Sequence, residues 1–163
     1  MTNEIKLNSI GLQTYTIRSR LTDAASFDAA FAKVRAMGYD EIQLAPCGIG
    51  YDVIARIAES YGLRVISILG RFADFVKAPD KLVKAAEGFG TDDICIGYQP
   101  FPDPASAYDF IERANKLSKR FREGGCTLSY HHHSHEFLPL GNGTNAFEML
   151  LDGLDENIRI VPD

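Results

Sequence analysis

The chain has 163 residues, and its 17 lysine and arginine side chains against 22 aspartate and glutamate side chains give a net charge of −5. Apolar residues at 45% and charged residues at 24% are ordinary for a globular protein and exclude a disordered chain. The acidic balance disfavours nucleic acid as a partner, which needs a broad basic surface. No run approaches the roughly 20 apolar residues of a membrane span, so we expect no membrane partner.

The start of the chain and its cysteines bear on the compartment. The segment from Met1 to Leu7 lacks the apolar core of a signal peptide, which predicts a cytoplasmic protein. Cys47, Cys95 and Cys126 are odd in number and widely spaced. That spacing is typical of reduced thiols and not of a disulfide framework or a CxxC metal site.

Short apolar runs alternate with helical patterns along the whole chain. The runs predict six strands, at residues 10–16, 41–44, 64–69, 93–98, 127–131 and 158–161. Apolar residues at helical spacing predict five helices between them, with faces that begin at Phe27, Ile54, Leu82, Ala107 and Phe147. Strand–helix alternation predicts parallel strands joined by crossover helices, in a single α/β domain over residues 1–163.

Two architectures are compatible with this alternation, an open doubly wound sheet and a closed eight-unit barrel. The first predicted strand leads to the segment Tyr15 to Arg18 and not to a GxGxxG loop, which disfavours a dinucleotide site. The strand starts recur about every 29 residues, so eight units would need roughly 230 residues. Spacing alone therefore leaves closure of the sheet open.

All four histidines lie in one segment with a glutamate, from Tyr130 to Phe137, at the carboxyl end of the fifth predicted strand. Parallel α/β folds bind ligands at this end of the sheet. Imidazole and carboxylate groups together suit Mn²⁺, Zn²⁺ or Co²⁺. The HExxH motif is absent, because Phe-Leu-Pro follows His135 and Glu136. We interpret the segment as a candidate site and not as four structural histidines.

Four segments resemble the sugar phosphate isomerase/epimerase family, whose barrel is like that of xylose isomerase. Residues 11–18 (GLQTYTIR) resemble its first strand, and residues 38–44 resemble its second, with Gln43 where a glutamate is usual. Residues 130–137 (YHHHSHEF) are similar to its fifth-strand motif YHNHxxEF, with His132 in place of asparagine. Residues 158–163 resemble the sixth strand, which ends in an aspartate.

The resemblance implies a partial (β/α)8 TIM barrel, with about six parallel strands and five helices, that is truncated at its C-terminus. It implies one divalent metal, Mn²⁺, Co²⁺, Zn²⁺ or Mg²⁺, with Glu136 and Asp163 as ligands. The ligands that the family places on later strands would be replaced by His132 or His135, or by water. Glu136 and His133 take the catalytic roles. The residues expected to bind substrate, a small-molecule carbohydrate, are Gln13, Tyr15, His131 and His133.

The implied function is metal-dependent isomerisation or epimerisation of a sugar or sugar phosphate, by proton transfer beside a carbonyl. The alternatives are a sugar- or metal-binding remnant without catalysis, a metal-dependent abasic-site endonuclease, and a fragment with no function of its own. An open barrel would also leave the first and sixth strands unpaired and its apolar interior exposed. We therefore expect either self-association, with a second copy covering the opening, or that the chain is part of a longer protein.

Overall fold

The computed structural model describes residues 9–141 and 143–163, so the segment Met1 to Leu7 lies outside the described residues. The strands are β1 (Gly11–Gln13), β2 (Glu41–Leu44), β3 (Arg64–Arg71), β4 (Asp93–Tyr98), β5 (Thr127–His131) and β6 (Arg159–Val161). The helices are α1 (Ala24–Ala36), α2 (Tyr51–Ser60), α3 (Phe72–Lys77), α4 (Pro79–Phe89), α5 (Pro104–Glu123) and α6 (Ala146–Gly153). Two 3-10 helices, η1 (Thr14–Arg20) and η2 (His135–Phe137), follow β1 and β5. No helix in this part of the chain is long and apolar enough to cross a membrane.

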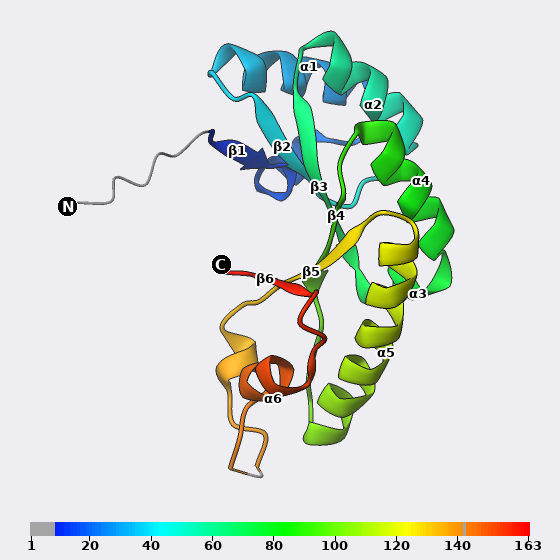
Figure 1. The fold of residues 1–163 in the computed structure, drawn as a ribbon. Coiled ribbons are helices and arrows are strands. Elements are labelled where there is room, and N and C mark those ends of the chain that lie inside the picture. The colour runs from blue at the N-terminus through cyan, green and yellow to red at the C-terminus, as the bar shows by residue number, and fades with distance from the viewer. Residues whose placement is uncertain (1–8, 142) are drawn as a thin grey trace, which may run out of the picture.

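The six strands form one parallel sheet in the order β1-β2-β3-β4-β5-β6, which confirms the predicted partial barrel. The sheet is curled, and the helices cover its convex side while the concave side is open (Figure 1). All six carboxyl ends therefore meet at one rim of the curled sheet, where loops are free to carry a site. β1 and β6 are the edges, and each is only three residues long.

Two local features differ from the sequence predictions. The first strand ends at Gln13, and Tyr15 lies in η1, because the Thr14 hydroxyl turns inward and accepts the backbone N–H of Ala45 at 2.7 Å. An additional short helix, α3, follows β3 directly. Its Phe75 packs against Gly70, where a Cβ would collide with the phenyl ring, so glycine permits this close approach.

The convex face of the sheet forms the main core with the helices. Tyr130 of β5 and Phe110 of α5 are fully buried there, with ring centroids 5.4 Å apart, and Phe72 packs 4.7 Å from Phe110. Ile94 and Ile96 of β4 join the same cluster. This layer buries large apolar side chains from every third or fourth position of α5, which is the pattern that the sequence predicts.

The concave face is largely polar. Gln13 donates to the Gln43 side chain at 2.8 Å, and Gln43 donates to the Ser67 hydroxyl at 3.1 Å, so a hydrogen-bonded ladder crosses β1, β2 and β3. In the other half of the sheet, the Ser129 hydroxyl donates to Asp93. The buried apolar cluster on this face consists of Ala45, Leu69 and Cys95. The concave face thus combines these hydrogen-bonded polar pairs with a small apolar cluster.

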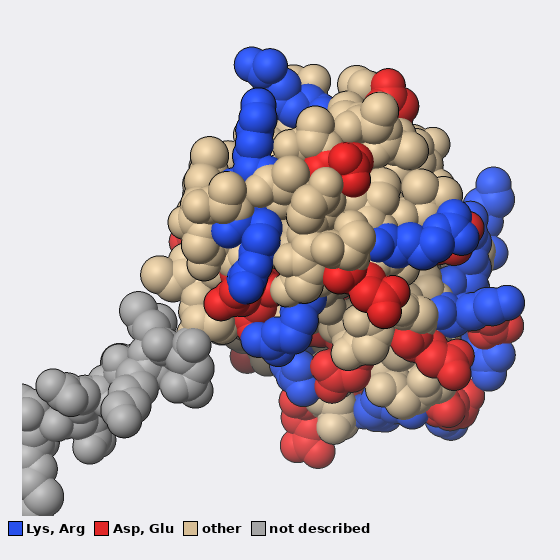
Figure 2. Space-filling view, turned by 90° about the horizontal axis from the view of Figure 1, so that it is seen from above, with Lys and Arg blue, Asp and Glu red and all other residues tan. Residues whose placement is uncertain are grey.

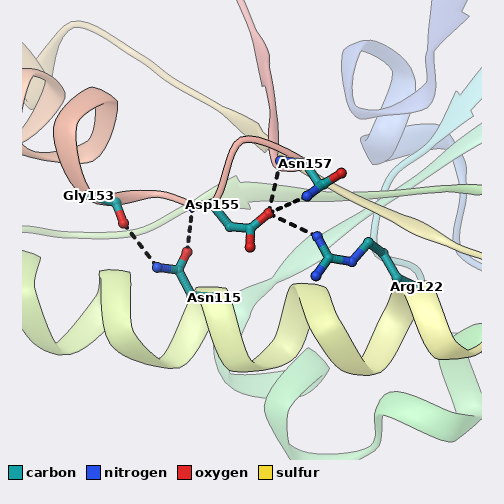
Figure 3. Close-up of polar contacts among 5 residues, drawn as sticks. All are labelled: Asn115, Arg122, Gly153, Asp155 and Asn157. Atoms are coloured by element: carbon teal, nitrogen blue, oxygen red, sulfur yellow. Dashed lines mark hydrogen bonds and ion pairs between the residues drawn. The ribbon is translucent and has the colours of Figure 1, made fainter.

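A polar network fixes the connection between α6 and β6 (Figure 3). Asn115 of α5 donates to the Gly153 carbonyl at 2.9 Å and accepts the Asp155 backbone N–H at 2.8 Å. The Asp155 carboxylate accepts from Arg122 at 2.9 Å and from Asn157. Helix α5 thereby sets where β6 begins, and β6 leads to Asp163 at the rim.

Candidate functional site

A cavity of about 360 Å³ opens at the rim formed by the carboxyl ends of the strands. All four residues that the sequence analysis expects to bind substrate line it: Gln13, Tyr15, His131 and His133. They come from β1, η1, β5 and the segment after β5, so curling of the sheet brings together residues more than a hundred positions apart in the chain. The volume is within the usual range for a small-molecule site, roughly 300–1,000 Å³.

His131 is the last residue of β5 and lies on the concave face, in register with Val161 of β6. Its side chain is almost fully buried, and its Nε2 lies 3.7 Å from a carboxylate oxygen of Asp163, which is itself exposed. Burial lowers the pKa of His131, the neighbouring His133 lowers it further, and Asp163 opposes both. The imidazole is thus biased toward its neutral form, which is the form that binds metal ions.

Glu136 is fully buried in η2, where its carboxylate accepts from two donors and lies beside His135. The Tyr130 hydroxyl donates to one carboxylate oxygen at 2.6 Å, and the His133 backbone N–H donates to the other at 2.9 Å. His135 Nδ1 lies 3.2 Å from that second oxygen. Burial, followed by the hydrogen bond to Glu136, raises the pKa of Tyr130, so the phenol keeps its proton and donates.

Two groups of side chains at this rim have the composition and spacing of a metal site. One contains His131, His133 and Asp163, the other contains His133, His135 and Glu136, and in each the ligand atoms lie within 4.8 Å of one another. Glu136 and Asp163, the two metal ligands expected from the sequence, therefore fall in different groups within the described residues, with His133 common to both.

The histidines differ in what they offer a metal. The Nδ1 atoms of His131 and His133 are buried and have no hydrogen-bond partner within the ranges described, so both imidazoles have a free polar atom beside the cavity. His135 already makes a 2.9 Å contact from Nε2 to the Gln99 carbonyl oxygen. His132 packs against the rings of Phe137 and Phe147 and is in neither group. Imidazole nitrogens with a carboxylate suit a divalent transition metal, so the residues present fit such an ion.

Among the lining residues that sequence reasoning missed, Tyr98 and Arg71 are the two with polar side chains. Tyr98 ends β4 and is 53% exposed, and its ring lies 5.8 Å from that of His133 and 4.9 Å from that of His135. Arg71 ends β3. The sequence signal that could have identified them is their position, because each is the last residue of a parallel strand, at the end where such sheets bind ligands.

The fold matches several solved structures, although no protein-family model and no curated protein matches the sequence. A sugar phosphate isomerase/epimerase from Parabacteroides distasonis aligns with all of this chain at a TM-score of 0.79 and 18% identity, and the chain covers 68% of it. A xylose isomerase-like TIM barrel protein from Mycobacterium smegmatis, in complex with magnesium, aligns with 95% of the chain at 0.74 and 17% identity, over 64% of its own length.

A family 2 AP endonuclease from Brucella melitensis aligns with 93% of the chain at a TM-score of 0.64 and 12% identity, over 67% of its own length. At sequence identities of 12% to 18%, the structural similarity establishes the fold alone. The chain has the fold of about two thirds of a xylose isomerase-like TIM barrel, which confirms for the fold the resemblance seen in the sequence.

Proposed function

We propose that this chain contains the substrate-binding and metal-binding site of a divalent-metal-dependent sugar isomerase or epimerase. The observation that supports this most is the single cavity lined by Gln13, Tyr15, His131 and His133, beside two groups of metal-ligating side chains. The similarity to a sugar phosphate isomerase/epimerase fold supports the same reaction class. The substrate would be a small carbohydrate, whose hydroxyl groups suit the amide, phenol and imidazole groups of this wall.

His131, His133 and Asp163 would hold the metal, and the group of His133, His135 and Glu136 is the alternative position. When bound, a divalent ion polarises the substrate oxygens and stabilises negative charge beside the carbon that loses a proton. His133 lines the cavity, and where His131 and Asp163 hold the ion without it, its imidazole is free to move that proton, because a metal-bound nitrogen has no lone pair to accept one. Glu136 is absent from the cavity wall, so we assign it a positioning role through the His133 backbone N–H and His135.

Two other functions make distinct demands on the molecule. A non-catalytic sugar- or metal-binding remnant would use the same cavity without turnover, and the chain spans only about two thirds of the first-named isomerase/epimerase. An abasic-site endonuclease would need a basic surface for the duplex. On the face shown in Figure 2, basic and acidic side chains are interspersed and form no continuous basic field among the described residues.

Metal-dependent thermal stabilisation tests the site directly. Mn²⁺, Co²⁺, Zn²⁺ and Mg²⁺ should be added separately to the metal-free chain, and at least one should raise Tm, because a ligand at a hundred times its Kd stabilises by about 2.7 kcal/mol. The shift should disappear in His131→Ala and in Asp163→Asn. It should persist in Asp152→Asn, the matched control, which changes an exposed carboxylate on α6.

Turnover assays separate the three functions. Interconversion of ketoses and aldoses or of epimers, lost in His131→Ala, supports the isomerase. Metal binding without turnover on a broad panel of sugars supports the remnant, and cleavage of an abasic duplex that is lost in Glu136→Ala supports the endonuclease. Absence of any thermal shift with all four metals would contradict the metal site.

A further inference from the structure

Three polar side chains on the concave face form one hydrogen-bonded ladder that ends at the cavity. Gln13 of β1 lies in register with Gln43 of β2, and Gln43 lies in register with Ser67 of β3. Gln13 lines the cavity, whereas Gln43 and Ser67 are not among its lining residues. Any effect of Gln43 on a ligand in the cavity is therefore exerted through Gln13.

The hydrogen bonds of the ladder run in one direction. Gln13 donates from Nε2 to Oε1 of Gln43 at 2.8 Å, and Gln43 donates from its own Nε2 to Oγ of Ser67 at 3.1 Å. Gln43 thus uses both ends of its amide within the sheet, and Ser67, which is 5% exposed, accepts the bond away from solvent. The terminal torsion of a free glutamine is broad and roughly two-fold, so bonding at both ends fixes which way this amide faces.

The fixed amide of Gln43 determines which atom Gln13 can offer to a ligand. Because Nε2 of Gln13 bonds the acceptor of Gln43, the carbonyl Oε1 of Gln13 is the end of the amide without a partner among the described residues. That oxygen has two lone pairs and accepts from hydroxyl groups. Half a turn of the Gln13 amide would bring two carbonyl oxygens together with no proton between them, and the hydrogen bond to Gln43 would be lost.

The ladder depends on an amide at position 43. The family that the sequence resembles usually has a glutamate there, and this chain has Gln43. An ionised carboxylate only accepts hydrogen bonds, so it could hold Gln13 but could not donate to Ser67. The neutral amide links the cavity wall to a buried hydroxyl two strands away and adds no negative charge beside the cavity.

We propose that Gln43 is a positioning residue, which holds the Gln13 amide so that Oε1 accepts from a hydroxyl group of the carbohydrate. This inference rests on the proposed function and names one feature of its substrate, a free hydroxyl that donates a hydrogen bond at the β1 side of the cavity. A carbonyl or ether oxygen at this place has no proton to donate and would be repelled by the Gln13 carbonyl. Gln13 is the residue that touches the substrate, and Gln43 acts through it.

Calorimetric titration of the full chain with neutral ketoses tests this assignment. D-Ribulose, D-xylulose and D-fructose are titrated with and without Mn²⁺, and each hydroxyl of the tightest binder is then replaced in turn by hydrogen and by fluorine. At one position both replacements should weaken binding by roughly three- to tenfold, which corresponds to one neutral hydrogen bond. Fluorine cannot donate a proton, so equal losses with hydrogen and with fluorine identify a hydroxyl that donates to the protein.

Variants of the ladder show whether Gln43 sets this selectivity. Gln43→Leu frees the Gln13 amide and should reduce the loss at that position to less than about twofold, as should Gln13→Leu. Gln43→Glu keeps an acceptor for Gln13 and should restore the wild-type selectivity. Ser129→Ala, the matched control, removes a buried hydroxyl that bonds Asp93 on the same face outside the ladder, and it should leave the selectivity unchanged.

The outcomes separate positioning from a structural role and from the proposed function. A purely structural role of Gln43 lowers Tm in Gln43→Leu but leaves the ratio of affinities for the parent sugar and its deoxy analogue as in the wild type. That result overturns the inference, as does a fluorine analogue that binds as tightly as the parent sugar at every position, or a failure of all three ketoses to bind. Hydroxyl-selective binding that depends on Gln43, without any turnover, supports the inference while the proposed isomerase fails.

Discussion

The two faces of the curled sheet are built on different chemistry, although the same strands supply both. On the convex face, large apolar side chains such as Phe110 and Tyr130 are buried against helices in ring-to-ring contacts. On the concave face, Gln13, Gln43 and Ser67 bond one another in a ladder, and His131 borders the cavity. Each strand alternates between the two environments because successive side chains point to opposite faces.

The convex face supplies most of the stability, and the concave face supplies the groups that can bind a ligand. Burial of apolar area on the convex face is the large stabilising contribution, since it scales with the area removed from water. The concave face contributes hydrogen bonds whose net value is small, but it holds the groups that can bind a ligand. Packing of the helices on the convex face thus stabilises the partial barrel, and the concave face is available for a binding site.

The largest loss of stability is expected from a substitution in the core on the convex face. Phe110→Ala should lower the free energy of unfolding by about 3–5 kcal/mol, because it leaves a cavity among Phe72, Phe101 and Tyr130. Urea denaturation followed by circular dichroism measures it. Tyr108→Ala, on the same helix and largely exposed, should change that free energy by less than about 0.5 kcal/mol. Similar losses in the two variants would show that α5 does not carry the core.

An intermediate effect is expected where the two faces meet at Tyr130. Its ring packs in the convex core and its hydroxyl donates to Glu136, so Tyr130→Phe keeps the packing and removes one donor from a buried carboxylate. We expect a loss of about 1–3 kcal/mol in the free energy of unfolding. Tyr108→Phe, which removes an exposed hydroxyl, serves as the control in the same denaturation assay. Equal stability of the wild type and Tyr130→Phe would mean that Glu136 finds another donor.

The smallest effect is expected on the concave side. Gln43→Leu removes the two hydrogen bonds to Gln13 and Ser67. Gln13 is half-buried and regains a partner in water, while the buried Ser67 loses one bond to its hydroxyl oxygen. The expected loss in the free energy of unfolding is about 1 kcal/mol or less. Gln43→Glu keeps an acceptor for Gln13 and should cost less than Gln43→Leu. A loss as large as that of Phe110→Ala would show that the concave face is a second core.

Much of the architecture follows from local sequence pattern. The apolar spacing that ends at Phe121 predicts α5, and the strand at residues 127–131 is confirmed residue for residue. The end of β1 was not predicted, because the Thr14 hydroxyl bonds Ala45, which directly follows β2 and is distant in the sequence. Helix α3 was not predicted either, since six residues give too short a pattern and its Phe75 fits only against Gly70.

The alternating order of elements and the histidine-rich segment at the end of β5 can both be predicted from local pattern, because periodicity and residue type are local properties. Where each side chain of that segment points depends on the tertiary structure. It places Glu136 inward against Tyr130, His132 among phenylalanines, and Asp163 beside His131. Those placements depend on which strands are neighbours and on how the sheet curls, and contacts between distant residues set both. The same contacts bring Arg71 to the cavity wall, where no sequence motif marks it.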